Sequence, residues 1–387
     1  MSKTLYLSAP YLMGNEKKYL NKCIKDNWIS TGGKFINLFE NKLSNFLNIK
    51  YAIGCINGTS ALHIALKVLG IKKNDEVLVP TLTFIAPVNS IIYNGGKPIF
   101  FDCDETCNLD IRSVIDFINT ETFFKKKYSY NKKTKRRIFG IIIVHVFGNA
   151  VNLEPLIKIC KQKNIKIIED ASESFGTYYK KGKIKNKYTG TIGDIGCFSF
   201  NGNKILTSGS GGMIVCNNKK LANKAKYLIN QAKNNSFEYI HDEVGYNYRI
   251  SNIHSAIGLA QIENIKLILR KKMQINKYYK KELSSNPKAI LLTLPDYSKN
   301  NNWMNVITFK NDISKLKLKK IYNIFERRNI QVRKIWYPNH LQKPYLHFQR
   351  YKISKAEIIQ KYSLCLPSSP NLEKTDIKKI LKIINIQ

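Results

Sequence analysis

The chain has 387 residues, of which 43% are hydrophobic, so it exceeds one typical domain and can bury a sizeable core. Its formal net charge of +37 favours nucleic acid or an anionic membrane as a partner, but the lysines are spread through nearly every segment and form no single binding face. One dense basic run, 125–137, is interpreted as a solvated loop. No run reaches the roughly 18 apolar residues of a membrane span, which argues against membrane insertion.

The first half of the chain alternates apolar strand patterns with helical patterns. Such alternation predicts a parallel sheet with helical crossovers. The strand patterns lie at 51–56, 76–79, 98–102, 139–146 and 165–168, and the helical patterns lie at 17–27, 35–47, 61–69, 85–93, 111–118 and 153–163.

The second half changes character after residue 255. Strand patterns at 197–200 and 213–216 and a helical pattern at 221–231 still belong to the first sheet, and a polar, aromatic loop at 239–249 follows them. The sequence therefore predicts an α/β protein with a large, mostly parallel-sheet domain at 1–255 and a smaller α+β domain at 256–387. In the second domain we expect one long helix at 253–283, strands at 306–309 and 332–336, and helices at 316–328 and 375–384.

The eight cysteines mostly lie inside apolar runs. They form neither a C-x-x-C pair nor a Cys/His cluster with zinc spacing, so no metal site is expected. The N-terminal residues lack the long apolar region of a signal peptide. These observations predict reduced core cysteines and a cytoplasmic protein.

The stretch 193–213 contains the first candidate catalytic residue. The strand pattern 197–200 runs into a polar turn that holds Lys204, and a glycine-rich loop then leads to the next apolar run. A lysine between two buried strands is a candidate for a desolvated amine, which can attack a carbonyl. Because the chain holds 64 Lys+Arg residues, a solvated charge is the alternative for any single lysine.

Small polar residues follow the strand 51–56 at the start of a helix. Gly58, Thr59 and Ser60 bring free N–H groups, the helix dipole and two hydroxyls together, which favours a phosphate site. Simple N-capping of the helix is the alternative.

Two further candidates stand at strand ends. Phe84 follows the strand 76–79, where ligands bind in open α/β sheets, and it can either stack on a flat ring or pack in the core. Asp170 follows the strand 165–168 and needs a cationic or hydrogen-bonding partner, because burying an unpaired carboxylate is costly. Helix capping and metal binding are alternatives, although no histidine is close in sequence and the spacing fits no metal loop.

Together these signals match the needs of pyridoxal 5′-phosphate. The helix start at Gly58 suits the phosphate, Phe84 suits the ring, Asp170 suits the pyridine nitrogen, and Ser199 with Lys204 suits the phosphate and the aldehyde. No glycine-rich dinucleotide fingerprint or P-loop competes with this interpretation.

The chain resembles the DegT/DnrJ/StrS family of sugar aminotransferases over essentially its whole length. The motifs that carry this resemblance are Asn-Gly-Thr-Ser-Ala-Leu at 57–62, Glu-Asp-Ala-Ser-Glu-Ser at 169–174, Gly-Asp-Ile-Gly-Cys-Phe-Ser-Phe at 193–200 with Asn-Lys at 203–204, and Gly-Tyr-Asn-Tyr-Arg at 245–249. The resemblance implies the aspartate aminotransferase fold and an enzyme with pyridoxal phosphate as cofactor.

The resemblance also implies a role for each candidate residue. Lys204 binds the aldehyde and carries the proton, and Asp170 pairs with the pyridinium nitrogen. Glu173 lies near the ring hydroxyl, and Asn247 reaches the phosphate of the neighbouring subunit, so a homodimer with shared active sites is expected. The stacking residue and the phosphate ligands are then Phe84, Thr59, Ser60 and Ser199.

A closer similarity is to the branch that makes 4-amino sugars for legionaminic acid and related nonulosonates, on the segments 28–33, 241–249 and 366–370. It implies amino transfer from L-glutamate to C4 of a nucleotide-linked 4-keto-6-deoxy sugar, UDP-2-acetamido-2,6-dideoxy-hexos-4-ulose, for surface-polysaccharide or nonulosonate biosynthesis and cell wall biogenesis. The alternative within the family is a GDP-perosamine-type synthase. A basic nucleic-acid-binding protein is the alternative from another class, and a family dehydratase is disfavoured because those members have His where Lys204 stands.

Overall fold

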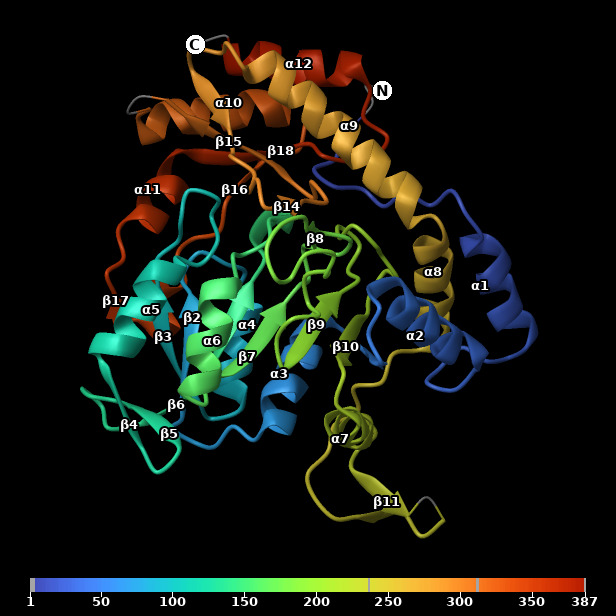
Figure 1. Cartoon of the computed structure of the whole chain (residues 1–387). Coiled ribbons are helices and arrows are strands. Elements are labelled where there is room, and N and C mark those ends of the chain that lie inside the picture. Colours follow the sequence, from blue (N-terminus) through green and yellow to red (C-terminus); the bar gives the residue numbers. More distant parts are fainter. Residues whose placement is uncertain (1–3, 236, 311–312, 386–387) are drawn as a thin grey trace.

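The computed structural model describes residues 4–235, 237–310 and 313–385, whose arrangement Figure 1 shows. Residues 1–3 and 386–387, at the outer ends of the two predicted domains, therefore lie outside the described residues. A ten-stranded sheet forms the centre of the larger part, with the order β1-β10-β9-β7-β6-β2-β3-β17 along its main path. Its strands are β1 (Tyr51–Cys55), β2 (Glu76–Pro80), β3 (Lys97–Phe101), β4 (Thr122–Lys125), β5 (Tyr128–Asn131), β6 (Arg137–Val144), β7 (Lys166–Asp170), β9 (Ile195–Ser199), β10 (Gly212–Cys216) and β17 (Arg350–Tyr351).

The main path of this sheet is mostly parallel, as expected. β7 pairs in parallel with β6 and β9, and β2 pairs in parallel with β3 and β6. β10 is the exception, since it is antiparallel to both β9 and β1. The link from β9 to β10 contains no helix, and a parallel return needs a longer crossover. The glycine-rich loop around Lys204 therefore reverses the chain.

Strand residues alternate between two helical layers. Val77 and Val79 pack into one core while Leu78 packs into another, as the period of two in a strand requires. Because both faces are covered, these strands are almost continuously apolar. The first layer contains α1 (Glu16–Lys25), α2 (Lys34–Leu47), α3 (Gly58–Leu69), α4 (Ala86–Tyr93), α7 (Lys219–Ile229) and α8 (Asn252–Glu263), and the second contains α5 (Ile111–Thr120) and α6 (Glu154–Gln162).

The predicted long helix at 253–283 is wrong, because the structure has two helices, α8 and α9 (Ile265–Leu283). The break is at Asn264, whose N–H bonds to the carbonyl of Gln261 and whose side-chain amide donates to the carbonyl of Ala260. A tightened turn with a competing side-chain bond ends α8, and apolar spacing carries no sign of it.

The interpretation of the basic run 125–137 as a plain loop is also wrong. Its first part closes a hairpin between β4 and β5, and Lys126 and Lys127 form the two-residue turn with φ of 46° and 66°. Both residues thus adopt the left-handed conformation that tight hairpin turns require. The buried side chains of Ser129 and Asn131 hold β5 to the sheet through bonds to the Lys163 carbonyl and to Glu76.

A second, four-stranded antiparallel sheet lies above the first in Figure 1 and has its own apolar core. The predicted boundary after residue 255 falls inside α8 and stays a prediction. The sheet has the order β13 (Ala289–Leu291), β15 (Asn305–Phe309), β18 (Ser363–Leu366) and β16 (Arg333–Lys334), and the helices nearby are α9, α10 (Lys315–Arg327), α11 (Lys355–Tyr362) and α12 (Lys374–Asn385).

Short elements complete the described chain. β8 (Tyr178–Tyr179) pairs with β14 (Ser298–Lys299), and β17 returns the C-terminal part to the main sheet beside β3. β11 (Lys233–Asn235) and β12 (Ile240–His241) form a ribbon that projects beyond α7 in Figure 1. The 3₁₀ turns are η1 (Val146–Gly148), η2 (Asn339–Leu341) and η3 (Lys343–Tyr345). Among the described residues, no helix combines the length and the apolar character needed to cross a membrane.

Candidate active site

A cavity of about 400 Å³ lies where the carboxyl ends of β7 and β9 meet the start of α3. Most of the predicted site residues line it, although they are far apart in the sequence. They are Gly58, Thr59, Phe84, Asp170, Glu173, Ser199 and Lys204.

Two predicted residues do not line this cavity. Ser60 is buried in the first turn of α3, where its N–H donates to the Asn57 side chain 2.8 Å away. Asn57 is thus the N-cap of α3. Because successive residues of a helix point about 100° apart, Thr59 and Ser60 do not both face the cavity. Asn247 is exposed and lies between the ribbon and Arg249.

Lys204 sits in the turn after β9, with 14% of its side chain exposed. Its Nζ lies 3.5 Å from Glu173 Oε1 and 4.3 Å from the centre of the Trp303 ring. The amine thus contacts both a carboxyl group and an aromatic face, and little water reaches it.

Asp170 ends β7 and is 5% exposed. Its Oδ1 accepts the N–H of Ser172 at 3.0 Å. Burial raises the pKa of this carboxyl group, and the Ser172 hydrogen bonds and the positive charge of Lys204 oppose that rise. A positively charged group bound beside Asp170 would stabilise the ionised form of this carboxyl group.

Glu173 follows Asp170 by three residues and faces Lys204. Its Oε2 accepts the N–H of Phe147 at 2.8 Å, and Phe147 has a φ of 55°. Burial raises the pKa of Glu173 to about 7, against the lowering effects of Lys204 and the Phe147 N–H. Phe147 thus adopts a strained left-handed backbone conformation at the residue whose N–H holds the Glu173 carboxyl group.

The other acidic residue of this strand end has a structural role. Glu169 is fully buried and accepts the N–H groups of Gly190, Ile192 and Gly193. His145 Nε2 lies 3.0 Å from Glu169 Oε2, and because the Val151 N–H donates to Nδ1, the ring proton is on Nε2. Among the described residues no group of His, Cys, Asp and Glu could hold a metal ion.

The cavity has the donors and acceptors that pyridoxal phosphate requires. At the start of α3, a Cβ at Gly58 would lie 2.7 Å from Ser199 Cβ, so glycine permits the close approach of helix and strand. The hydroxyls of Thr59 and Ser199 flank this start, and Thr83 Oγ1, in another lining residue, is buried without a hydrogen-bond partner in the described structure. With the Lys204 amine and the Asp170 carboxylate, this set fits the cofactor's phosphate, aldehyde and ring nitrogen.

Reasoning from the sequence missed several lining residues, and three of them lie far from the predicted ones in the chain. Trp303, Arg333 and Trp336 come from the C-terminal part of the chain, and the Trp336 ring stacks on Phe147 with centres 4.8 Å apart. Nothing in their local sequence pattern distinguishes them from ordinary core or surface residues.

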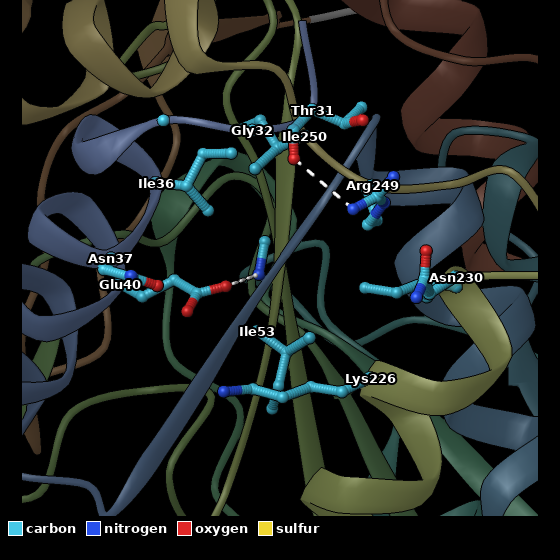
Figure 2. A pocket seen from close by; sticks show the side chains of 13 residues that line it. Thr31, Gly32, Ile36, Asn37, Glu40, Ile53, Lys226, Asn230, Arg249 and Ile250 are labelled. Carbon is cyan, nitrogen blue, oxygen red and sulfur yellow. Dashed lines mark hydrogen bonds between the residues drawn. The ribbon is translucent and has the colours of Figure 1, made fainter. Parts of the chain in front are cut away.

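A second cavity, of about 330 Å³, is lined by parts of the segments 28–33 and 245–249 and shares no lining residue with the first (Figure 2). Glu40 accepts the N–H of Gly54 at 2.7 Å, and burial raises the pKa of Glu40. Arg249 donates to the Thr31 carbonyl at 3.4 Å, while its Nε is buried without a partner in the described structure. These two motifs therefore meet in space but not at the first cavity.

Known proteins resemble this chain over most of its length. GDP-perosamine synthase of Escherichia coli O157:H7 is 37% identical over 388 residues, covering 99% of this chain and 98% of that protein. UDP-4-amino-4,6-dideoxy-N-acetyl-beta-L-altrosamine transaminase of Campylobacter jejuni is 34% identical over 282 residues, covering 72% and 70%. The structure of Helicobacter pylori PseC, an aminotransferase of pseudoaminic acid biosynthesis, superposes with a TM-score of 0.88 at 24% identity, over 99% of this chain and 98% of that one.

The structural likeness confirms the expected α/β aminotransferase fold. The sequence profile of the DegT/DnrJ/EryC1/StrS aminotransferase family matches residues 10–385. The chain therefore belongs to this family of aminotransferases, whose cofactor is pyridoxal phosphate.

Proposed function

We propose that this sugar aminotransferase moves an amino group from L-glutamate to C4 of a nucleotide-linked 4-keto-6-deoxy sugar. The proposal rests on the observation that Lys204, Asp170 and the start of α3 all line the same cavity. The names of two relatives, the Campylobacter transaminase and GDP-perosamine synthase, support a nucleotide-linked amino sugar as the product.

Bound pyridoxal phosphate supplies an aldehyde that accepts amino groups and a ring that takes up electrons from a breaking C–H bond. Lys204 would bind the aldehyde through Nζ, and its free amine would move the proton of the donor's Cα. Asp170 would hold a proton on the ring nitrogen by its negative charge. Thr59 and Ser199 would bind the phosphate at the start of α3.

The walls of the cavity support this chemistry by limiting water and orienting groups. Phe84 is 53% exposed at the cavity edge, where it can cover one face of a flat ring. Glu173 Oε1 is positioned to exchange a proton with Lys204 Nζ, since burial raises the pKa of Glu173 to about 7.

The nucleotide is the finer part of the proposal, and we place GDP before UDP. The GDP-perosamine synthase matches 99% of the chain, whereas the UDP-sugar transaminase matches 72%. This order reverses the expectation from the sequence segments 28–33, 241–249 and 366–370. The UDP-linked sugar stays the second candidate because both relatives have more than 30% identity to this chain.

We further propose a homodimer in the cytoplasm, with Asn247 of one subunit at the phosphate of the other. Asn247 is exposed and outside its own cavity, which suits a role in a neighbouring one. Exposed apolar side chains lie at the turn of the projecting ribbon, on Phe237 and Tyr239, and just after it, on Val244, with 92%, 67% and 77% exposed. All eight cysteines are buried free thiols, as expected for a reducing compartment.

A panel of GDP-, UDP- and dTDP-linked 4-keto-6-deoxy sugars with L-glutamate tests the proposal. We expect 2-oxoglutarate and an aminated sugar nucleotide by mass spectrometry, with the GDP-linked sugar giving the highest kcat/KM. Lys204→Ala is the inactive control. If the protein binds pyridoxal phosphate but aminates none of these sugars, the proposed substrate class is wrong.

A further inference from the structure

Lys272 is a buried lysine that the proposed reaction does not use. It lies in α9 and is 2% exposed. Burial lowers the pKa of its amine to about 7. The side-chain hydrogen bonds of Lys272 within the described residues go to no carboxylate, and a buried amine without a carboxylate partner costs stability. Its position therefore has to be explained by what the amine contacts.

The amine contacts two groups that converge beside the proposed catalytic lysine. Lys272 Nζ donates to the Trp303 carbonyl at 2.9 Å and to Ser8 Oγ at 3.5 Å. The indole N–H of Trp303 and the hydroxyl of Ser8 both donate to the carbonyl of Asn203, at 2.6 Å and 2.9 Å. Asn203 directly precedes Lys204 in the chain.

Trp303 also contacts Lys204 directly and is fixed from both sides. Its ring centre lies 4.3 Å from Lys204 Nζ, and the side chain is 3% exposed. On one side the Asn301 side chain accepts the backbone N–H of Trp303 and donates to the carbonyl of Glu173. On the other side Lys272 holds the Trp303 carbonyl, so the backbone of Trp303 is fixed and the bond to the Asn203 carbonyl then holds the indole.

We propose that Lys272 is a positioning residue for Lys204. By holding the Trp303 carbonyl and the Ser8 hydroxyl, it fixes the indole face and the Asn203 carbonyl that together set where the Lys204 amine lies. This inference rests on the proposed function, in which Lys204 is the reacting amine. It assigns the Lys272 amine to the geometry of the site, because no carboxylate pairs with the amine and both of its hydrogen-bond acceptors lead to the backbone beside Lys204.

Lys272→Met tests the inference, since methionine fills a similar volume without a donor. We expect kcat to fall by roughly tenfold to a hundredfold with the KM for glutamate little changed, because small displacements at a reacting group cost rate more than binding. The melting temperature should change little, because the relief of no longer burying an amine offsets the loss of its hydrogen bonds to the Trp303 carbonyl and the Ser8 hydroxyl. The exposed Lys277, on the same helix, gives the control Lys277→Met, which should keep the wild-type kcat.

A second readout does not depend on turnover. In cofactor-free protein, an amine-reactive reagent should label Lys204 at a rate changed severalfold by Lys272→Met and unchanged by Lys277→Met, as measured by mass spectrometry of the Lys204 peptide. If Lys272→Met does not fold, Ser8→Ala and Trp303→Phe provide the test. Each removes one bond to the Asn203 carbonyl, and each should lower kcat and change the labelling rate.

The outcomes separate this inference from the proposed function. Wild-type kcat and wild-type labelling of Lys204 in Lys272→Met overturn the positioning role. A lower melting temperature with unchanged kcat per folded molecule also overturns it, because Lys272 then serves stability alone. An inactive wild-type protein instead overturns the proposed function.

Discussion

The two walls of the cavity are built differently. The sheet wall consists of residues at strand ends and at the start of α3, and the outer wall consists of residues from the C-terminal part. In the sheet wall, Asp170 and Glu173 are no more than 5% exposed and are held by backbone N–H groups. The sheet wall is Gly58, Thr59, Asp170, Glu173, Ser199 and Lys204, and the outer wall is Trp303, Arg333 and Trp336.

The difference indicates a division of work. Groups that exchange protons lie on the rigid wall, where burial shifts pKa values and hydrogen bonds fix geometry. In the outer wall Trp303 contacts Lys204, but Arg333 is exposed and Trp336 is half-buried, so changes at these two residues can alter what binds without disturbing the reacting groups. Five experiments test this division, from the largest expected effect to the smallest.

Loss of the Lys204 amine from the sheet wall should abolish activity. Lys204→Ala removes both the group that binds the cofactor's aldehyde and the carrier of the proton, so turnover should fall to background while circular dichroism stays unchanged. Lys204→Arg should fail as well, because a guanidinium group stays protonated. Full turnover by either purified variant contradicts the assignment of Lys204.

Removing the negative charge of Asp170 from the sheet wall should slow the reaction but leave cofactor binding unchanged. We expect Asp170→Asn to lower the single-turnover rate with glutamate by roughly 10²–10³, since an amide does not stabilise a protonated ring nitrogen. The fraction of cofactor bound, measured by its absorbance, is the control. An unchanged rate would reduce Asp170 to a structural acceptor for the Ser172 N–H.

On the outer wall, Arg333→Met should change binding more than rate. The guanidinium is exposed at the cavity, where it can attract the diphosphate of a nucleotide sugar, so KM for the sugar should rise by about tenfold with kcat little changed. Arg327→Met, an exposed change on α10, is the matched control. A fall in kcat at constant KM would place Arg333 among the reacting groups.

A third contribution to the site should come from a second subunit. When Lys204→Ala and Asn247→Asp are mixed, each mixed dimer has one site with an intact Lys204 from one chain and an intact Asn247 from the other. Subunit exchange should restore up to about half of one dimer's activity by the two-fold geometry. If mixed dimers form without activity, or if the wild-type monomer is fully active, the shared site is wrong.

The smallest effect is a pH dependence of stability from the sheet wall. Burial raises the pKa of Glu173 from 4.5 to about 7 in the folded, cofactor-free protein. Between these values the folded state binds a proton that the unfolded state has released, so stability falls as pH rises from about 4.5 to about 7. Glu173→Gln should therefore raise the melting temperature by a few degrees more at pH 7 than at pH 5. An equal change at both pH values contradicts this.

Reasoning from the sequence located the sheet wall because its residues share a local sign. Asp170, Ser199 and Lys204 each follow an apolar run, and the ends of parallel strands meet at one edge. Ser60 does not line the cavity, since the Asn57 cap fixes the orientation of the first turn of α3, and its role as a phosphate ligand stays a prediction.

The residues of the outer wall are not marked in the sequence by a position at the end of a parallel-strand pattern. Trp303 reaches Lys204 from about a hundred residues further along the chain, and only tertiary packing brings them together. The turn at Asn264 and the reversal of β10 were missed for a related reason, because a single side-chain bond or a short link decides them. The role of Asn247 needs a second subunit, so its position in one chain leaves it a prediction.

Neighbouring residues of β7 have different tasks, because side chains alternate along a strand. Glu169 anchors the backbone of Gly190, Ile192 and Gly193, whereas Asp170 lines the cavity. In a survey of all substitutions in living cells, both positions should tolerate little change, but for separate reasons. Variants of Glu169 should lower the amount of protein that accumulates, whereas variants of Asp170 should accumulate normally and work poorly. Measuring abundance beside activity would thus separate the structural residue from the chemical one, although they are consecutive in the chain.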